Sequence, residues 1–460
     1  MDCPVVLAAI FICGIGGTFQ YGFCVSVMTS PSAFIKKLIN TTCVERYDFS
    51  LEEWQVSLIW SFIVSIFCIG GLLGSLMAGP LTSKFGKRCL LLNNFVAIAG
   101  ALLMILSQTA VSFEMIMVAR FLYGINSVGL SAQTMYLIEC APKRLRGMVG
   151  VSVATFLSLG RFSGQLLGIE LLGTEKDWPW LLGFNGFAAL FQLFTLPFLP
   201  ESPRFLLLER GDSQASAKAF ERLWGKNDYS RELDDMMKEK ASLHSIPNQS
   251  VLELFQSRSL RWQLFTILIA FSSLQLSGIN AVYFYSFEVL SAAGIPHDKL
   301  AYAALGTGLC ELVTSTTCFI IIESMGKKVL LYRGYIAMSV TLGLLTITKS
   351  ISWLPYCSLV LVFFFIFFFA IGPATTAPLP GEILPQSFKS AGYTLGCTIN
   401  WMGLFALGML FPTMVENLES FCFLIFLVFC LVCGLYVAFN VPETKNRTVL
   451  EITAEFERMH

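Results

Sequence analysis

The sequence predicts an all-α membrane protein with twelve transmembrane helices in two six-helix bundles. Its 460 residues are 55% hydrophobic and only 13% charged. The mean hydropathy of +0.68 is far above that of an ordinary soluble chain. A helix needs about 20 apolar residues to cross a bilayer core. Twelve stretches reach this length, at 5–28, 56–79, 89–108, 114–138, 148–172, 178–199, 262–290, 299–322, 329–349, 355–381, 390–414 and 420–440.

Charged motifs between these stretches recur at a nearly constant distance of 240 to 243 residues. The repeated motifs are Gly86-Lys87-Arg88 with Gly326-Lys327-Lys328, Glu139 to Arg146 with Glu382 to Lys389, and Pro200-Glu201-Ser202 with Pro442-Glu443-Thr444. Three ordered matches indicate two homologous halves in one membrane orientation, related by a pseudo-twofold axis. We therefore expect bundles at 1–200 and 262–440, a short cytoplasmic helical linker at 201–261 and a cytoplasmic tail at 441–460.

The distribution of Lys and Arg predicts the orientation. The loops after the even-numbered spans, together with the tail, hold 22 of these residues, whereas the opposite loops hold six. Without the ten in the long linker the ratio is still 12 to six, so both termini should be cytoplasmic. The loop at 29–55 then lies outside, where Asn40 begins a glycosylation sequon. The sequons at Asn248 and Asn446 fall on the cytoplasmic side and are interpreted as chance matches.

The composition argues against several functions. Lys and Arg number 31, as do Asp and Glu, so the balance of charge suggests no nucleic-acid partner. The signature of an ATP-binding P-loop is absent, and the three histidines lie in loops or the tail. We expect no enzyme activity, no metal and no cofactor. Cys430 and Cys433 could be a redox or metal pair, but inside an apolar span they are interpreted as packing residues.

Four amide side chains lie near the middle of apolar spans and need a partner or water there: Gln165, Gln275, Asn280 and Asn400. Each amide offers donors and an acceptor to a hydroxylated ligand and stays uncharged at every cellular pH. Hydrogen bonding between helices is the alternative role of such groups. As a set, the four are predicted to line a solute site.

At these positions the chain resembles a known family. The motifs are Phe19-Gln20-Tyr21-Gly22, GPLTSKFGKR at 79–88, ECAPKRLRG at 139–147, PESPRFLL at 200–207, QLSGIN at 275–280, Asn400-Trp401 and VPETK at 441–445. Together they resemble the facilitative hexose transporters, in the sugar-porter branch of the major facilitator superfamily, and most of all the fructose-type class. The resemblance covers essentially the whole chain and implies the major facilitator fold.

The resemblance also implies a substrate site. It assigns sugar contacts to Gln165, Gln275 and Asn280, and it adds Tyr21, Asn400 and Trp401. The chain departs from the family at two positions.

One departure is Leu274, which replaces the glutamine that usually precedes QLSGIN. The other is Glu311, which replaces an asparagine of the eighth span that contacts sugar hydroxyls in the family. We expect Glu311 to line the substrate site, which thereby loses one amide and gains an acid.

Arg161 is the expected partner of Glu311. It lies one helical turn before Gln165, at a position where the family pattern is apolar. At about 1.5 Å per residue, Arg161 is roughly 20 Å and Glu311 roughly 18 Å from the cytoplasmic ends of their spans. An isolated charge at that depth is unfavourable, whereas a pair is tolerated. We therefore predict an ion pair between the halves; the alternative is that each side chain faces an aqueous cavity separately.

The resemblance implies two gates. Gly372, Pro373 and Pro378 interrupt the tenth span, as expected for a hinge beside a binding site. Phe284 and Tyr285 resemble an aromatic outer gate, although simple packing is the alternative for any aromatic among 41 Phe.

On the cytoplasmic side, charged residues at helix ends are expected to link the halves when that side is closed. These residues are Lys87, Arg88, Glu139, Arg146, Glu323, Lys327, Lys328, Glu382 and Lys389. The alternative is that these charges only set the orientation of the protein in the membrane. This would explain the Lys and Arg residues but not the acidic ones, because acidic residues contribute little to orientation.

The expected function is passive transport of a hexose such as fructose or glucose by alternating access. The expected partners are the sugar and the lipid bilayer, and the expected residence is the plasma membrane; the oligomeric state is open. Proton-coupled relatives carry an acid on the first span where this chain has Cys24, which favours passive flow. Two alternatives stay open: a carrier of another small polar solute such as urate, and a sugar receptor that does not transport.

Overall fold

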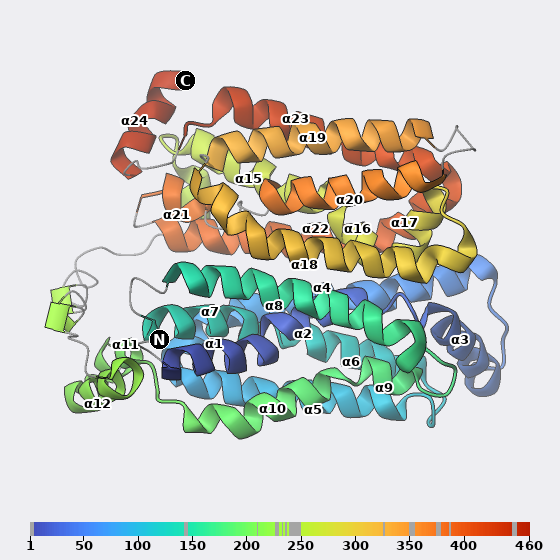
Figure 1. Ribbon diagram of the computed structural model, residues 1–460, viewed down its shortest axis with the longest axis horizontal. Coiled ribbons are helices and arrows are strands. Elements are labelled where there is room, and N and C mark those ends of the chain that lie inside the picture. Colours follow the sequence, from blue (N-terminus) through green and yellow to red (C-terminus); the bar gives the residue numbers. More distant parts are fainter. Residues whose placement is uncertain are drawn as a thin grey trace.

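The computed structural model describes every residue except 1–3, 142–145, 209, 226–229, 232, 235–236, 239–249, 325–326, 349–354, 374–378, 386–387 and 444–448. All regular secondary structure in the described part is helical. The helices form two groups (Figure 1), the first half in blue to green and the second half in yellow to red. This is the two-bundle arrangement that the repeat predicts.

The first group contains the helices of the amino-terminal half. They are α1 (Pro4–Gly16), α2 (Thr18–Ser26), α3 (Ser32–Tyr47), α4 (Glu53–Phe85), α5 (Lys87–Leu106), α6 (Phe113–Ile125), α7 (Val128–Cys140), α8 (Arg146–Leu166), α9 (Trp178–Leu182) and α10 (Asn185–Thr195). The loop predicted to lie outside contains α3, at the end of the molecule away from both termini (Figure 1).

The second group repeats this pattern with helices of the carboxyl-terminal half. They are α15 (Arg261–Leu276), α16 (Ile279–Phe284), α17 (Ser286–Ala292), α18 (Leu300–Ser324), α19 (Lys327–Thr348), α20 (Pro355–Ile371), α21 (Leu379–Ile383), α22 (Lys389–Leu418) and α23 (Cys422–Asn440).

Seven segments of the described chain are long and apolar enough to cross a membrane: Pro4–Ser26, Glu53–Ala78, Lys87–Leu106, Arg261–Phe284, Lys328–Thr348, Ala391–Leu418 and Cys422–Asn440. The other five predicted spans coincide with α6 and α7, α8, α9 and α10, α18, and α20 with α21. Several of these are interrupted. For example, α6 ends at Ile125 and α7 begins at Val128, because Asn126 and Ser127 form a turn between them.

The described parts of the linker and tail contain helices that lie at the end of the molecule that holds both termini (Figure 1). Their helices are α11 (Pro203–Leu208), α12 (Ser213–Trp224), α14 (Val251–Gln256) and α24 (Val449–Met459). Asp212 caps α12 by accepting a hydrogen bond from the Ala215 amide. At the other end of α12, Trp224 Nε1 donates to the Cys140 carbonyl oxygen at 2.9 Å, which attaches the linker to α7.

Within the described residues, the helix pairs that join the halves include α4 with α22, α8 with α18 and α2 with α16. Apolar residues form one large buried cluster that includes Phe23, Trp60, Tyr283 and Phe411 and therefore extends across both halves. Towards the linker the buried apolar residues divide into two clusters, one in each half. In this structure the halves are thus packed together on the side of α3 and less so on the side of the linker.

Candidate functional site

Arg161 and Glu311 are in contact between the two halves. Arg161 Nη1 on α8 forms an ion pair with Glu311 Oε1 on α18. The residues are 5% and 6% exposed, so the pair is buried. The Arg161 guanidinium also lies over the Tyr283 ring, 4.5 Å from its centroid. A cation shared between a carboxylate and an aromatic face is compensated inside an apolar protein.

A chain of amides continues from this ion pair into the second half. Arg161 Nη2 donates to Asn280 Oδ1 at 3.3 Å, and Asn280 Nδ2 donates to Gln275 Oε1 at 2.5 Å. Gln275 Nε2 then donates to Asn400 Oδ1 at 2.6 Å. Each amide accepts on its oxygen and donates from its nitrogen, so the chain crosses from α8 to α16, α15 and α22. The hydrogen-bonded chain therefore brings together Glu311 and four other predicted residues, which are Arg161, Asn280, Gln275 and Asn400.

Gly278 makes this arrangement possible. It lies between α15 and α16 with φ +91°, the left-handed region that favours glycine. A Cβ at this position would lie 2.6 Å from the Phe426 ring as well. The break lets Asn280, at the start of α16, turn back towards Gln275 near the end of α15. The glycine of the QLSGIN motif is thus explained by backbone geometry.

Three contacts, two polar and one of packing, follow one another along α8 and α18, which run antiparallel. Ser158 Oγ donates to Ser315 Oγ at 2.8 Å, and one turn later Arg161 pairs with Glu311. One further turn along, Gln165 lies against Gly308, where a Cβ would be 2.2 Å from Gln165 Oε1. Small residues on one helix thus make room for large polar side chains on the other. The two polar atoms of the Gln165 side chain, Nε2 and Oε1, are buried and have no hydrogen-bond partner within the described chain.

Tyr21 and Trp401 form an aromatic contact across the halves. Their ring centroids are 5.7 Å apart in an edge-on geometry, and Phe67 on α4 contacts both rings. Trp401 Nε1 donates to Ser75 Oγ on α4 at 3.0 Å. These contacts place Trp401, which follows Asn400 in α22, against the amino-terminal half.

The predicted outer-gate residues, Phe284 and Tyr285, are buried in this structure. Tyr285 donates to the Gly408 carbonyl oxygen at 2.6 Å and stacks on Phe411, while Phe284 is 1% exposed. Thr29 Oγ1, from the other half, donates to the Tyr283 carbonyl oxygen at 3.2 Å. Tyr283 and Thr29 were not predicted from the sequence. The one sequence feature that could have indicated Tyr283 is its position directly before the predicted gate residues Phe284 and Tyr285.

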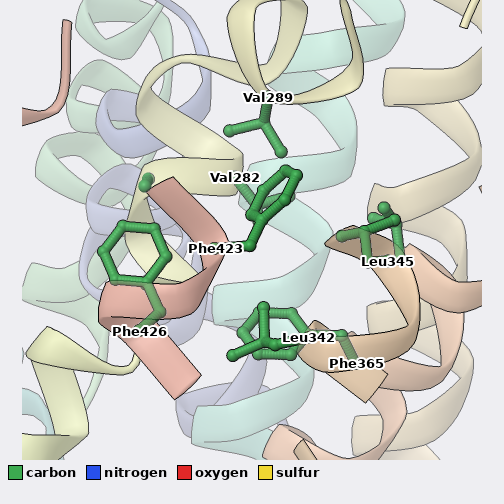
Figure 2. Close-up of a pocket in the computed structure, with 10 residues that line it drawn as sticks. Val282, Val289, Leu342, Leu345, Phe365, Phe423 and Phe426 are labelled. Carbon is green, nitrogen blue, oxygen red and sulfur yellow. The ribbon is translucent and has the colours of Figure 1, made fainter. Parts of the chain in front are cut away.

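A small apolar cavity lies among α16, α17, α19, α20 and α23 (Figure 2). It has a volume of about 10 Å³ and is lined by Gly278, Ala281, Val282, Val289, Leu342, Leu345, Val362, Phe365, Phe423 and Phe426. That volume is near the minimum for one water molecule, and a wholly apolar lining does not hold water. The cavity is therefore not the solute site.

The predicted hinge is only partly described. Gly372 and Pro373 follow α20, and a Cβ on Gly372 would lie 2.7 Å from the Leu330 carbonyl oxygen, so α20 and α19 approach closely there. Pro378 lies outside the described residues.

One of the predicted cytoplasmic charges has its described partners within its own half. Lys87, which is predicted to link the halves when that side is closed, here donates from its backbone amide to Glu201 Oε1 at 2.8 Å and from its Nζ to the Leu199 carbonyl oxygen at 2.6 Å. Both partners, Glu201 and Leu199, belong to the same half as Lys87. Ser202, the residue after Glu201, donates a hydrogen bond from its Oγ to Glu139 Oε2 on α7 at 2.5 Å.

Sequence reasoning missed Glu201 and Ser202, although their motif is one of the three repeats. Arg88 is exposed and Lys328 is partly buried. The side chains of Arg146, Glu323, Lys327, Glu382 and Lys389 lie outside the described part. Among the described residues, no group of three His, Cys, Asp or Glu side chains is placed to hold a metal ion.

Two helical bundles that enclose a buried polar cluster at their interface define a membrane carrier of the major facilitator type. A family profile described as "Sugar (and other) transporter" matches residues 9–456. The chain belongs to this sugar transporter family, whose members are transporters and not enzymes.

Individual proteins agree with this assignment. The chain is 41% identical to "Solute carrier family 2, facilitated glucose transporter member 9" of Mus musculus, over 98% of this chain and 86% of the relative. It is 39% identical to "Solute carrier family 2, facilitated glucose transporter member 5" of Bos taurus, over 99% and 93%. The inward-open xylose transporter XylE of E. coli has the same fold, with a TM-score of 0.80 at 19% identity over 98% of this chain and 99% of XylE.

Proposed function

We propose that the protein carries a neutral hexose, such as fructose or glucose, down its gradient by alternating access. The observation that carries this proposal is the amide chain of Asn280, Gln275 and Asn400, continuous with a charge-balanced ion pair between the halves. Amides recognise hydroxyl groups without carrying charge. The relatives named as facilitated glucose transporters support the same class of solute.

The mechanism follows from which contacts join the halves. With the outer side closed where Thr29 of the first half donates to the Tyr283 carbonyl oxygen, beside the buried Tyr285, the polar cluster is accessible only from the linker side once the halves separate there. Rocking of the halves then exposes the cluster to the other side. We propose that Arg88, Arg146, Lys328, Glu382 and the other predicted inner charges hold the linker side closed in that second state. The proposed bundles at 1–200 and 262–440 are the bodies that rock.

The ion pair supports passive flow over proton coupling. An unpaired carboxyl group inside a membrane can carry protons. Glu311 is instead paired with Arg161, and Cys24 occupies the position of the acid found on the first span of proton-coupled porters. We expect sugar uptake to be independent of a pH gradient imposed across the membrane.

The test is uptake by purified protein in liposomes, with labelled fructose, glucose and urate offered separately. Hexose uptake that saturates, and that is accelerated by sugar on the opposite side, would support the proposal. Urate uptake without hexose uptake would assign another cargo. Sugar binding without counterflow would identify a receptor.

Removing one amide of the site is expected to weaken sugar binding. Gln275→Ala leaves the facing groups of Asn280 and Asn400 without their partner, and unsatisfied buried polar groups are unfavourable by about 1–3 kcal/mol. We expect the KM for the hexose to rise about tenfold to a hundredfold, measured as uptake in liposomes. Gln108→Ala, which removes an exposed amide bonded to the Glu175 carbonyl oxygen, is the control and should leave KM unchanged. Equal KM values for the two variants would contradict the proposed site.

We further propose that α3 is extracellular, that both termini are cytoplasmic and that the protein resides in the plasma membrane. Asn40 is exposed on α3, at the end of the molecule away from the termini (Figure 1). Glycosylation at Asn40 is therefore expected, so glycosidase treatment should increase the electrophoretic mobility of the native protein but not of Asn40→Gln. A shift that disappears in Asn248→Gln would place the linker outside and reverse the orientation.

A further inference from the structure

The face of α5 and α10 that points away from the second half is strongly apolar. α5 is one of the segments that can cross a membrane, and it packs against α10 along the outer edge of the first group (Figure 1). Leu92 and Phe95 of α5 are 52% and 58% exposed, while Phe194 of α10 and Phe198 in the turn after it are 68% and 74% exposed. Since no described part of the chain covers these side chains, this face borders the acyl chains of the bilayer.

Arg88 lies at the linker-side end of the apolar face. It precedes Leu92 by four residues and Phe95 by seven, a spacing that places the three side chains on one side of α5. The Arg88 side chain is exposed, and the ion pairs between described residues do not include it. A long cationic side chain beside a lipid-facing stripe reaches the level of the lipid headgroups.

Arg222 brings a second guanidinium group to the same level. It is exposed on α12 and donates from Nη2 to the Phe198 carbonyl oxygen. Lys87 donates from Nζ to the carbonyl oxygen of the following residue, Leu199, at 2.6 Å. Lys87 and Arg222 are close enough to repel each other electrostatically. The first turn of α5, which holds Arg88, and the exposed side of α12 therefore meet at the end of α10.

The acid in this region does not neutralise the two arginines. Glu201 Oε1 accepts hydrogen bonds from the backbone amides of Lys87 at 2.8 Å and of Ser202 at 3.2 Å. Among the hydrogen bonds of the described residues, Arg222 uses only Nη2 and Arg88 uses none of its side-chain donors. Positive charge with free N–H donors thus lies at the edge of a lipid-facing surface.

We propose that Arg88 and Arg222 bind the phosphate group of an anionic phospholipid in the leaflet on the linker side, with an acyl chain along Leu92 and Phe95. Guanidinium groups suit phosphate because their N–H donors match its oxygens in pairs. Basic side chains near the cytoplasmic surface attract anionic lipids in the same way. The site is independent of the transported solute, because it lies on the outer face of the first half. Arg88 is also a predicted inner link, so a bound phosphate favours the state in which that link is open.

The test is thermal unfolding of the purified protein in detergent, with phosphatidylserine or phosphatidylcholine of the same acyl chains added. We expect phosphatidylserine to raise the unfolding temperature in a saturable way, because a ligand that binds only the folded state stabilises it. Phosphatidylcholine should give a clearly smaller rise. Glycerophosphoserine, the same headgroup without acyl chains, should give none at the same concentration. An equal rise with glycerophosphoserine would indicate a site for soluble phosphates and overturn the lipid site.

Removing the two charges should weaken the response to phosphatidylserine. Arg88→Gln and Arg222→Gln should each raise the concentration for half-maximal stabilisation about fivefold, and the double variant about twentyfold. Arg88→Lys/Arg222→Lys keeps both charges and should stay within about fivefold of the wild type. Arg46→Gln is the matched control, because Arg46 is also exposed and donates to a carbonyl oxygen, that of Ala110, on the side of α3. It should respond like the wild type.

Two further results would overturn the lipid site. One is equal stabilisation of the wild-type protein by phosphatidylserine and phosphatidylcholine, a comparison that needs no variant to fold. The other is a double glutamine variant that keeps the wild-type response to phosphatidylserine.

Discussion

Replacing Arg161 by leucine is expected to abolish uptake and to lower the free energy of unfolding by about 3–5 kcal/mol. The substitution leaves the Glu311 carboxylate buried without a compensating charge, at 6% exposure. It also removes the donor to Asn280 Oδ1, from which the amide chain continues. The unfolding free energy can be followed by thermal or denaturant unfolding in detergent, and uptake in liposomes.

The double variant separates pairing from a general intolerance to mutation. Arg161→Leu/Glu311→Leu removes both charges, so it should be more stable than either single variant, and apolar replacement of a buried pair is often close to neutral. Arg458→Leu is the control, because Arg458 pairs with Glu455 on the surface and is 77% exposed there. We expect it to change stability by less than about 1 kcal/mol. Failure of the double variant to recover any stability or uptake would remove the support for pairing.

Replacing Gly160 by valine is expected to prevent accumulation of folded protein. A Cβ at Gly160 would lie 2.2 Å from the Phe19 carbonyl oxygen, and one at Gly22 would lie 2.1 Å from the Leu157 carbonyl oxygen. The backbones of α2 and α8 are therefore in direct contact at these two glycines. Backbone atoms cannot rotate away as a side chain can, so α2 and α8 must separate. We expect a loss of about 3 kcal/mol or more.

Size-exclusion profile and thermal stability in detergent measure this effect. Gly343→Ala is the control, because its Cβ would meet only the Leu427 Cδ1 methyl group at 3.3 Å, which can move. That variant should be as stable as the wild type within about 1 kcal/mol. If Gly160→Val were equally stable, α2 and α8 could not be packed as closely as described. Because α8 also carries Arg161 and Gln165, any transport defect must be compared with the amount of folded protein.

Hydrophobic length and the charged repeat were sufficient to predict an all-α, two-bundle membrane fold. They also placed Arg161 and Glu311 at the same depth, because rise per residue converts sequence distance into depth within a span. The role of the inner charges stays a prediction. The contacts of Lys87 with Glu201 and Leu199 in its own half could not be predicted, because they depend on the path of a turn that has no periodic pattern.

Some site residues could not be predicted from residue type. Tyr283 resembles any other aromatic in a chain with 41 Phe and 13 Tyr, and only the fold brings its ring under Arg161. The Thr29 hydroxyl group donates a hydrogen bond to the backbone carbonyl oxygen of Tyr283, which is 254 positions away. Neither contact has a local signature in the sequence.

The sequence by itself determined the environment of this protein, its helical content, its repeat and the depth of its polar residues, since these depend on composition and on spacing along a single helix. Only the tertiary structure decided which polar atoms meet and which stay unused. The three contacts between α8 and α18 join residues about 150 positions apart, so no local pattern indicates which side chains of the two helices face each other. Interactions between residues that are close in sequence determine the helices, whereas packing between distant helices determines the polar cluster between the halves.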